Sequence, residues 1–346
     1  MKEPEQKLVV QNGWLDALVK ALRQKGTRVL APVERDGTVD FREINSAGEM
    51  AADYVNTRVP LKEILFPRTE AILEFDQPSA GDVVFRAIEA DVPATVVIGA
   101  RPCDLSAIGV LDAVFNWDYH DTFYGRRRAN TTFVGMACRA SDENCFCENV
   151  GGGPADNEGG DIFVRPTAAG AVLEVMTDRG KELGESIEGA APATGSEELQ
   201  PVATTEERFD VEKIKGWLDE HFDDDFWLDM SLKCLGCGAC SYLCPTCHCF
   251  DIVDESDWRG GERRRNWDCC SFSLFTQHTS GHNPRPDQQS RCRNRLMHKF
   301  KYFVERFGRR ACVGCGRCIR VCGAGQNLVN VLTDITRAEA AASDSA

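Results

Sequence analysis

The spacing of eight cysteines near the C-terminus constrains this chain more than any other feature. Two runs share one pattern, in which three cysteines stand three residues apart and a fourth follows four residues later. Bacterial ferredoxins hold 4Fe-4S clusters with this spacing, and in two-cluster ferredoxins the fourth cysteine of each run binds the other run's cluster. We therefore predict two clusters that exchange their fourth ligands. The first would be bound by Cys234, Cys237, Cys240 and Cys322, and the second by Cys312, Cys315, Cys318 and Cys244.

The cysteine spacing argues against structural zinc. A zinc site of this kind would use two cysteine pairs for each ion, whereas each run here has four evenly packed thiols.

Cysteine usage also indicates the compartment. The chain has 17 cysteines, and its first residues lack the basic and then apolar pattern of a secretion signal. We therefore expect reduced, metal-binding thiols in a cytoplasmic protein. No apolar run approaches the ~20 residues that a membrane helix needs, so no membrane span is expected.

Charge is divided unevenly along the sequence. The chain carries 40 Lys and Arg against 54 Asp and Glu, a net charge of −14. From Ser231 onward there are 17 basic against 11 acidic side chains, which leaves 23 against 43 before that point. Thiolate-bound clusters are anionic, so nearby cations such as Arg317 and Arg320 would favour their reduced state. This explains the basic excess, and we expect no nucleic-acid partner.

Local patterns in the N-terminal part are those of an α/β domain. Apolar residues at helical spacing predict a helix over 14–22, and Asp36-Gly37 predicts a hairpin turn between strands at 27–33 and 38–44. Downstream, β-branched apolar runs are typical of buried parallel strands that feed helices. These runs are residues 94–100, which precede a helical pattern over 105–115, and residues 131–137.

The predicted fold is an α/β (α+β) N-terminal domain with a short parallel sheet, followed by a C-terminal ferredoxin-like two-cluster 4Fe-4S domain with a large insertion. The first domain would span residues 1–210 and the second 211–335, with the insertion at 250–310. Residues 338–346 are small and polar, and the segment 336–346 is expected to form a flexible tail.

Four further cysteines occur in the N-terminal half: Cys103, Cys138, Cys145 and Cys147. The first two each end a predicted strand, and the carboxyl ends of neighbouring parallel strands share one edge where ligands bind. The other two lie in a polar loop, where burial in a core does not explain them. We therefore predict a third 4Fe-4S cluster on these four thiols. In the alternative, Cys103 and Cys138 are ordinary small core residues.

Five cysteines remain, and their separations match no standard ligand set. Packing around the clusters explains them better than a further metal site. They are Cys247, Cys249, Cys269, Cys270 and Cys292. The insertion also carries several arginines and Lys299, for which a solvated basic surface is the default interpretation. The alternatives are ion pairs with the acidic N-terminal half and a docking face. Neither a dinucleotide fingerprint nor a hydrolytic motif is present, so we predict no catalytic residues.

Several motifs together resemble one family. They are Arg101-Pro102-Cys103-Asp104-Leu105, Cys145-Phe146-Cys147, Cys244 through Asp251, Trp267-Asp268-Cys269-Cys270, Gly281 through Arg285, and His298 through Tyr302. The chain resembles the iron–sulfur subunit of anaerobic sulfite reductase and the beta subunit of sulfhydrogenase-type cytosolic NiFe hydrogenases, which are 4Fe-4S dicluster proteins. The resemblance covers roughly residues 60–322. The chain departs from the ferredoxin pattern at Gly323, where a proline usually follows the fourth cysteine of the run. The difference affects the expected backbone geometry after Cys322 more than the ability of Cys322 to bind a cluster.

The resemblance implies an electron-transfer subunit without an active site of its own. Single electrons would pass between a flavin subunit that handles NAD(P)H and a terminal reductase, of which anaerobic, dissimilatory-type sulfite reductase is the first interpretation. The alternatives are an NAD(P)H-linked NiFe hydrogenase and a flavin-coupled heterodisulfide-reductase complex. A hydride delivers two electrons and a cubane accepts one, so flavin is expected in a partner subunit. A different class of interpretation is an enzyme whose N-terminal domain itself binds flavin or substrate.

Overall fold

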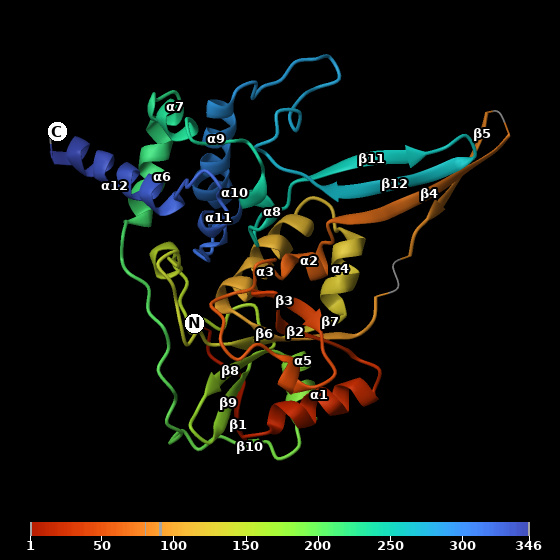
Figure 1. Cartoon of the computed structure of the whole chain (residues 1–346), viewed down its shortest axis with the longest axis vertical. Helices are drawn as coiled ribbons and strands as arrows, with labels where there is room; N and C mark the ends of the chain where they lie inside the picture. Colours follow the sequence, from red (N-terminus) through yellow and green to blue (C-terminus); the bar gives the residue numbers. More distant parts are fainter. Residues whose placement is uncertain (1, 80, 90–91, 345–346) are drawn as a thin grey trace. The chain divides into compact units, whose positions relative to one another are not determined.

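The structure is a computed structural model that describes residues 2–79, 81–89 and 92–344. The chain forms two compact units, each assembled from separate stretches of sequence (Figure 1). Unit 1 contains Met1–Leu61, Val92–Val211 and Cys312–Arg317, and unit 2 contains Lys62–Asp91, Glu212–Ala311 and Cys318–Ala346. The chain passes from unit 1 to unit 2 after Val211, close to the predicted boundary at residue 210. Two segments, Lys62–Asp91 and Cys312–Arg317, belong to a different unit from their neighbours in sequence.

An eight-stranded mixed sheet is the centre of unit 1. Its strand order is β10-β1-β9-β8-β7-β6-β2-β3. The central strands β2, β6, β7 and β8 are parallel, and antiparallel strands continue the sheet on both sides. The strands are β1 (Gln6–Gln11), β2 (Arg28–Arg35), β3 (Thr38–Glu43), β6 (Thr95–Ala100), β7 (Thr131–Met136), β8 (Ile162–Pro166), β9 (Gly170–Val175) and β10 (Ala191–Pro192).

Local sequence signals explain several of these elements. The predicted N-terminal helix is α1 (Trp14–Gln24), which buries Leu18, Val19 and Leu22 in the core beside the sheet. Strands β2 and β3 form the predicted hairpin, closed by the pair Arg35 and Thr38. The two turn residues both have positive φ, 52° at Asp36 and 70° at Gly37, as a type I′ turn requires.

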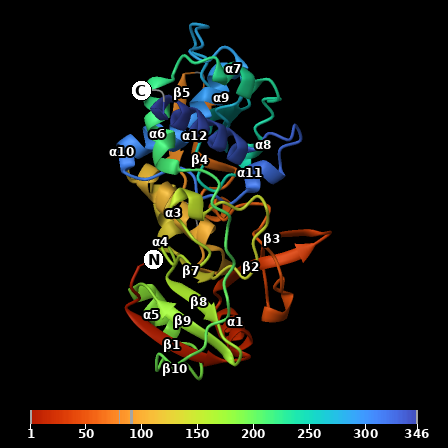
Figure 2. The ribbon, with the colours of Figure 1, turned by 90° about the vertical axis from the view of Figure 1, so that its left-hand side faces the viewer.

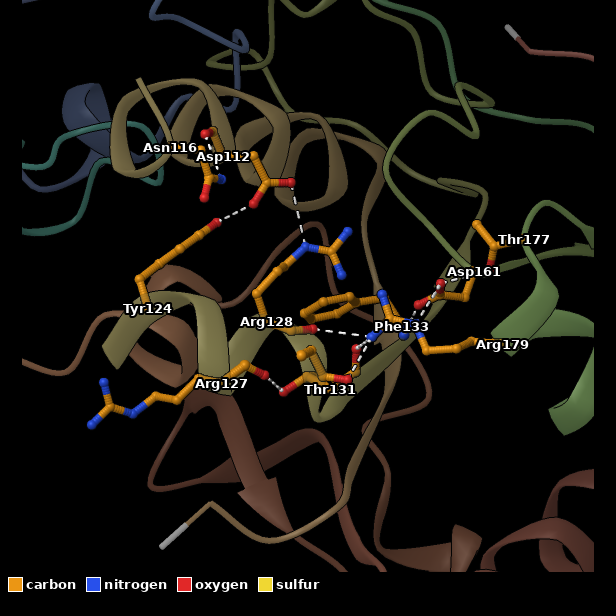
Figure 3. Close-up of polar contacts among 11 residues, drawn as sticks. Asp112, Asn116, Tyr124, Arg127, Arg128, Thr131, Phe133, Asp161, Thr177 and Arg179 are labelled. Carbon is orange, nitrogen blue, oxygen red and sulfur yellow. Dashed lines mark hydrogen bonds and ion pairs between the residues drawn. The ribbon is translucent and has the colours of Figure 1, made fainter. Parts of the chain in front are cut away.

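Partly or fully buried polar contacts fix the helices around the parallel strands (Figure 3). Helix α3 (Pro102–Phe115) follows β6, and α4 (Thr122–Ala129) precedes β7. The Asp112 carboxylate accepts hydrogen bonds from the Tyr124 hydroxyl at 2.6 Å and from Arg128 Nε at 3.3 Å, which ties α4 to α3. Asp161 accepts from the Phe133 amide at 2.8 Å and thereby holds the start of β8 against β7. Helix α5 (Asp178–Glu185) packs beside β8 and β9 (Figure 2).

A four-stranded antiparallel sheet in unit 2 joins two hairpins that are far apart in sequence. Its order is β11-β12-β4-β5, with β4 (Thr69–Ser79), β5 (Asp82–Ala87), β11 (Phe250–Ser256) and β12 (Gly260–Trp267). Between β12 and β4, Arg265 forms a buried ion pair with Glu70, with Nε 3.0 Å from Oε1. The Trp267 indole donates to the Phe66 carbonyl at 3.0 Å. These contacts explain why residues 62–91 belong with the cysteine-rich unit.

Helices of different lengths make up much of the rest of unit 2. They are α2 (Lys62–Leu65), α6 (Val211–Glu220), α7 (Phe226–Ser231), α8 (Ala239–Tyr242), α9 (Gln288–Met297), α10 (Phe303–Phe307), α11 (Arg317–Arg320) and α12 (Leu328–Asp344). Helix α11 begins at Arg317, the last residue of a unit 1 segment. Helices α9 and α10 are joined without a break by one π-helical turn, His298–Tyr302. Isolated π turns occur frequently at functional sites.

The C-terminal segment, expected to be a flexible tail, is helical as far as Asp344. Residues 336–344 continue helix α12, and the last two residues lie outside the part that the structure describes. Across the described residues, no helix combines the length and the apolar character that crossing a bilayer requires.

Candidate iron–sulfur sites

A cavity in unit 2 gathers cysteines from both runs. All four residues predicted to bind the first cluster line its wall: Cys234, Cys237, Cys240 and Cys322. Cys318 and Cys292 line it as well. The tight loop that presents Cys234 and Cys237 turns at Gly236 and Gly238, whose φ values are 65° and 74°. Helix α8 begins directly after this loop and carries Cys240.

The environment of Cys234 favours a thiolate. A hydrogen bond from Cys292, together with the Gly236 amide and the Gln288 side chain, lowers the pKa of Cys234 to about 5. The donor from Gln288 is its amide nitrogen, 3.1 Å from the sulfur. Because the thiolate is the form that binds metal, this end of the cavity suits an iron ligand.

Cys244, the fourth cysteine of the first run, is buried beside a buried lysine. Lys299 Nζ lies 3.3 Å from Cys244 Sγ and also donates to Thr246 Oγ1 and to the Ala311 carbonyl. A hydrogen bond from the Cys247 thiol, with the charges of Lys299 and Arg295, holds the pKa of Cys244 well below its usual range. A buried ammonium group is stabilised by an adjacent anion, so this arrangement suits a thiolate at Cys244.

Two more cations approach the same stretch of chain. Lys62 Nζ donates to the carbonyls of Cys247 at 2.9 Å and Ser241 at 3.2 Å, and lies 4.1 Å from the centre of the Trp267 ring. Arg295 donates to Ser241 Oγ at 2.8 Å. Burial by itself would lower the pKa of Arg295, but the surrounding cysteine thiols hold it well above its usual range. Unit 2 therefore surrounds its cysteine loops with positive charge, as anionic clusters require.

The members of the second predicted ligand set belong to different units. Cys312 and Cys315 are in unit 1, whereas Cys318 and Cys244 are in unit 2. This ligand set therefore stays a prediction from the cysteine spacing.

A second cysteine-lined cavity lies within unit 1. The four N-terminal cysteines predicted to form a third site all line it: Cys103, Cys138, Cys145 and Cys147. Cys103 is in the first turn of α3, and Cys138 follows the end of β7, so two neighbouring parallel strands deliver them to one edge. Cys315 of the second run lines the same cavity.

Close backbone contacts hold the segment Cys312–Arg317 against this cavity. The Asn56 side chain donates to the Cys315 carbonyl at 2.8 Å, and the Phe146 amide donates to the Gly314 carbonyl at 2.8 Å. Gly314 has φ of 62°, and a Cβ there would stand 2.5 Å from backbone atoms of Cys147. The second cysteine run and the N-terminal cysteine loop therefore meet inside one compact unit.

The thiols of the unit 1 cavity differ from Cys234 and Cys244 in their ionisation. Burial raises the pKa of Cys138 to about 11 and of Cys147 to about 12. Burial, together with Asp104, also raises the pKa of Cys103 well above its usual range. Metal binding at this site must therefore displace protons, which an iron–sulfur cluster with four thiolate ligands would do.

The donor sets of both cavities fit 4Fe-4S clusters. Such a cluster takes cysteine thiolates as ligands, and at least four cysteines line each cavity. Among the described residues, no group of three or more His, Cys, Asp or Glu side chains is arranged to hold a single metal ion. The fit rests on thiol donors, buried cations and enclosed space.

Sequence reasoning missed several residues of these sites. Lys62 and the amide of Gln288 lie in no motif, and charged residues such as Lys62 and Lys299 normally indicate a surface. Lys299 and Arg295, expected to pair with the acidic half or a partner, instead face cysteine loops of their own unit. Arg317, expected from the sequence to be a cation near the clusters, forms an ion pair with Asp104 at 2.8 Å.

Comparison with known proteins agrees with this interpretation of the cysteines. The family model described as a 4Fe-4S dicluster domain matches residues 233–326. The sulfhydrogenase 2 subunit beta of Pyrococcus furiosus is 32% identical over 319 residues, which cover 89% of this chain and 92% of the relative. The chain belongs to the sulfhydrogenase beta-subunit family. No solved structure matches.

Membership of this family refines the sequence-based interpretation. The chain is an iron–sulfur subunit for electron transfer, and the dicluster match supports bound 4Fe-4S clusters. The similarity favours the hydrogenase-type alternative over sulfite reductase, which was the first interpretation of the sequence motifs.

Proposed function

We propose that this chain is the beta subunit of an NAD(P)H-linked NiFe hydrogenase of the sulfhydrogenase type. It relays single electrons between a flavin subunit that handles NAD(P)H and the hydrogenase subunit. The observation that carries the proposal is the meeting of Cys315 with Cys103, Cys138, Cys145 and Cys147 around one cavity. Cysteines of a ferredoxin run and of a separate N-terminal site share a wall, as adjacent members of an electron relay would.

The proposal includes three cubanes with the ligands predicted from the sequence. Cys234, Cys237, Cys240 and Cys322 hold the first, Cys312, Cys315, Cys318 and Cys244 the second, and Cys103, Cys138, Cys145 and Cys147 the third. Such clusters supply one-electron transfer when bound.

The chain's own groups prepare these sites. Lys299 and Arg295 supply positive charge around Cys244, and the Gly236 amide and Gln288 stabilise the Cys234 thiolate. The close packing of Gly314 against Cys147 fixes the spacing between two cysteine loops.

A three-part assay on the assembled complex tests the relay function. Cys240→Ser should abolish NAD(P)H-driven hydrogen production. In the same complex, the flavin subunit should keep its NAD(P)H-driven dye reduction, and the hydrogenase subunit should keep its dye-driven hydrogen production. Loss of either partial activity would contradict a relay role, because it would place this chain in the chemistry of a partner. If the chain co-purified with a siroheme subunit instead of a NiFe subunit, the sulfite reductase interpretation would be restored.

A further inference from the structure

The side chain of Gln288 reaches the first cysteine loop from a neighbouring helix. Gln288 is the first residue of α9, and the Asp287 carboxylate fixes the start of that helix by accepting from the Ser290 amide at 2.7 Å. From this position Gln288 Nε2 lies 3.1 Å from Cys234 Sγ and 3.5 Å from Cys292 Sγ. One amide group therefore spans a predicted cluster ligand and the extra cysteine of the same cavity.

Arg291 determines which end of this amide faces the sulfur. Its Nε and one terminal nitrogen donate to Gln288 Oε1 at 3.3 and 3.0 Å. Its other terminal nitrogen donates to the carbonyls of Arg285 and Pro286, and the side chain is buried. Because guanidinium has donors only, it binds the amide oxygen and leaves the NH2 group directed at Cys234. Two hydrogen bonds to the oxygen also polarise the amide and strengthen its N–H donors.

The cysteine loop leaves space for this contact. Gly236, two residues after Cys234, has φ of 65°, and a Cβ there would stand 3.0 Å from Gln288 Oε1. Gln288 and Arg291 line an open hollow that shares Leu235 and Ser271 with the cysteine cavity.

We propose that Gln288, oriented by Arg291, is a positioning residue that raises the reduction potential of the cluster bound through Cys234. The inference rests on the proposed function, because it requires a cubane at that site. An N–H donor to a ligating sulfur stabilises the extra negative charge of the reduced state, so removal of the donor favours the oxidised state.

Redox titration of the anaerobically purified full chain, followed by electron paramagnetic resonance, tests this role. In Gln288→Leu, the reduced-to-oxidised ratio of one cluster at fixed potential should fall about tenfold, equal to a shift of about −59 mV for a one-electron couple. Gln288→Glu keeps the length and an oxygen for Arg291 but presents an acceptor to the sulfur, and it should shift the same cluster further. Arg291→Met should shift it in the same direction by less.

Gln289→Leu is the matched control, since it makes the same substitution one residue along α9. It should leave every midpoint potential unchanged. Full iron content with unshifted potentials in both Gln288 variants would overturn the inference while leaving the clusters in place. Loss of iron from both Gln288 variants would also overturn it, because Gln288 would then have a structural role. Absence of cubane iron from the wild-type chain would instead refute the proposed function.

Discussion

A buried ion pair connects Arg317 with Asp104, with 2.8 Å between the guanidinium nitrogen and Oδ1. Both side chains are almost fully enclosed, and Arg317 also donates to the carbonyl and hydroxyl of Thr57. Asp104 follows Cys103 in sequence, and Arg317 comes two residues after Cys315. The pair therefore connects the chain segments that carry these two predicted cluster ligands, both of which belong to unit 1.

Breaking this pair should destabilise unit 1. Arg317→Met leaves the Asp104 carboxylate buried without its cation, which typically costs about 3–5 kcal/mol. The double variant Arg317→Met with Asp104→Leu removes both charges and should recover much of that loss. Urea unfolding measures the free energy of unfolding of both variants. Equal losses of that free energy in the single and double variants would contradict the pairing.

Two arginines of β12 should differ sharply in their contribution to stability. Arg265 pairs with Glu70 in the buried interior of the four-stranded sheet, whereas Arg263 pairs with Asp254 on its exposed face. Arg265→Met should therefore cost about 3–5 kcal/mol, whereas Arg263→Met should have little effect because its ion pair is exposed to solvent. Similar losses in the free energy of unfolding would show that the buried pair does not hold β12 against β4.

Removal of the Lys299 charge should make one cluster harder to reduce. In Lys299→Met the ammonium group 3.3 Å from Cys244 Sγ is lost, so the reduced state loses an adjacent cation. We expect the midpoint potential of the cluster bound through Cys244 to fall by at least about 60 mV, one tenfold step for a one-electron couple. Lys301→Met is the control, because Lys301 pairs with Asp219 and not with a cysteine. An equal shift in both variants would mean that general charge, and not contact, sets the potential.

Gly314→Ala should lower the stability of unit 1 by more than the strain of its positive φ alone would. Gly308 has nearly the same φ, 66° against 62°, but a Cβ there meets no atom within 4 Å. Gly308→Ala should therefore show only the left-handed strain of about 1–2 kcal/mol. Gly314→Ala adds a clash with the backbone of Cys147, and its unfolding midpoint should fall clearly further. Equal midpoints would contradict the close packing of the two loops.

Local signals predicted much of unit 1 from the sequence. Helix α1, the β2–β3 hairpin and the parallel pair β6–β7 follow from apolar periodicity and turn residues that act over a few positions. The cysteines predicted for the first and third clusters line two cavities because spacing and strand ends place them there.

Long-range pairing left no such signal. Strand β4 pairs with β12 almost two hundred residues later, and residues 62–91 therefore belong to the unit that the sequence placed after residue 210. Lys62 and Lys299 are buried only because tertiary contacts put thiols and carbonyls around them. The residue type alone predicts an exposed position for a lysine side chain.

The most direct test of the account counts iron and acid-labile sulfide per chain in anaerobically purified protein. Three cubanes predict about twelve irons in the wild-type chain, and about eight in the variant with Cys145→Ser and Cys147→Ser. About eight irons in both proteins would contradict the third cluster and confine electron transfer to the two ferredoxin runs.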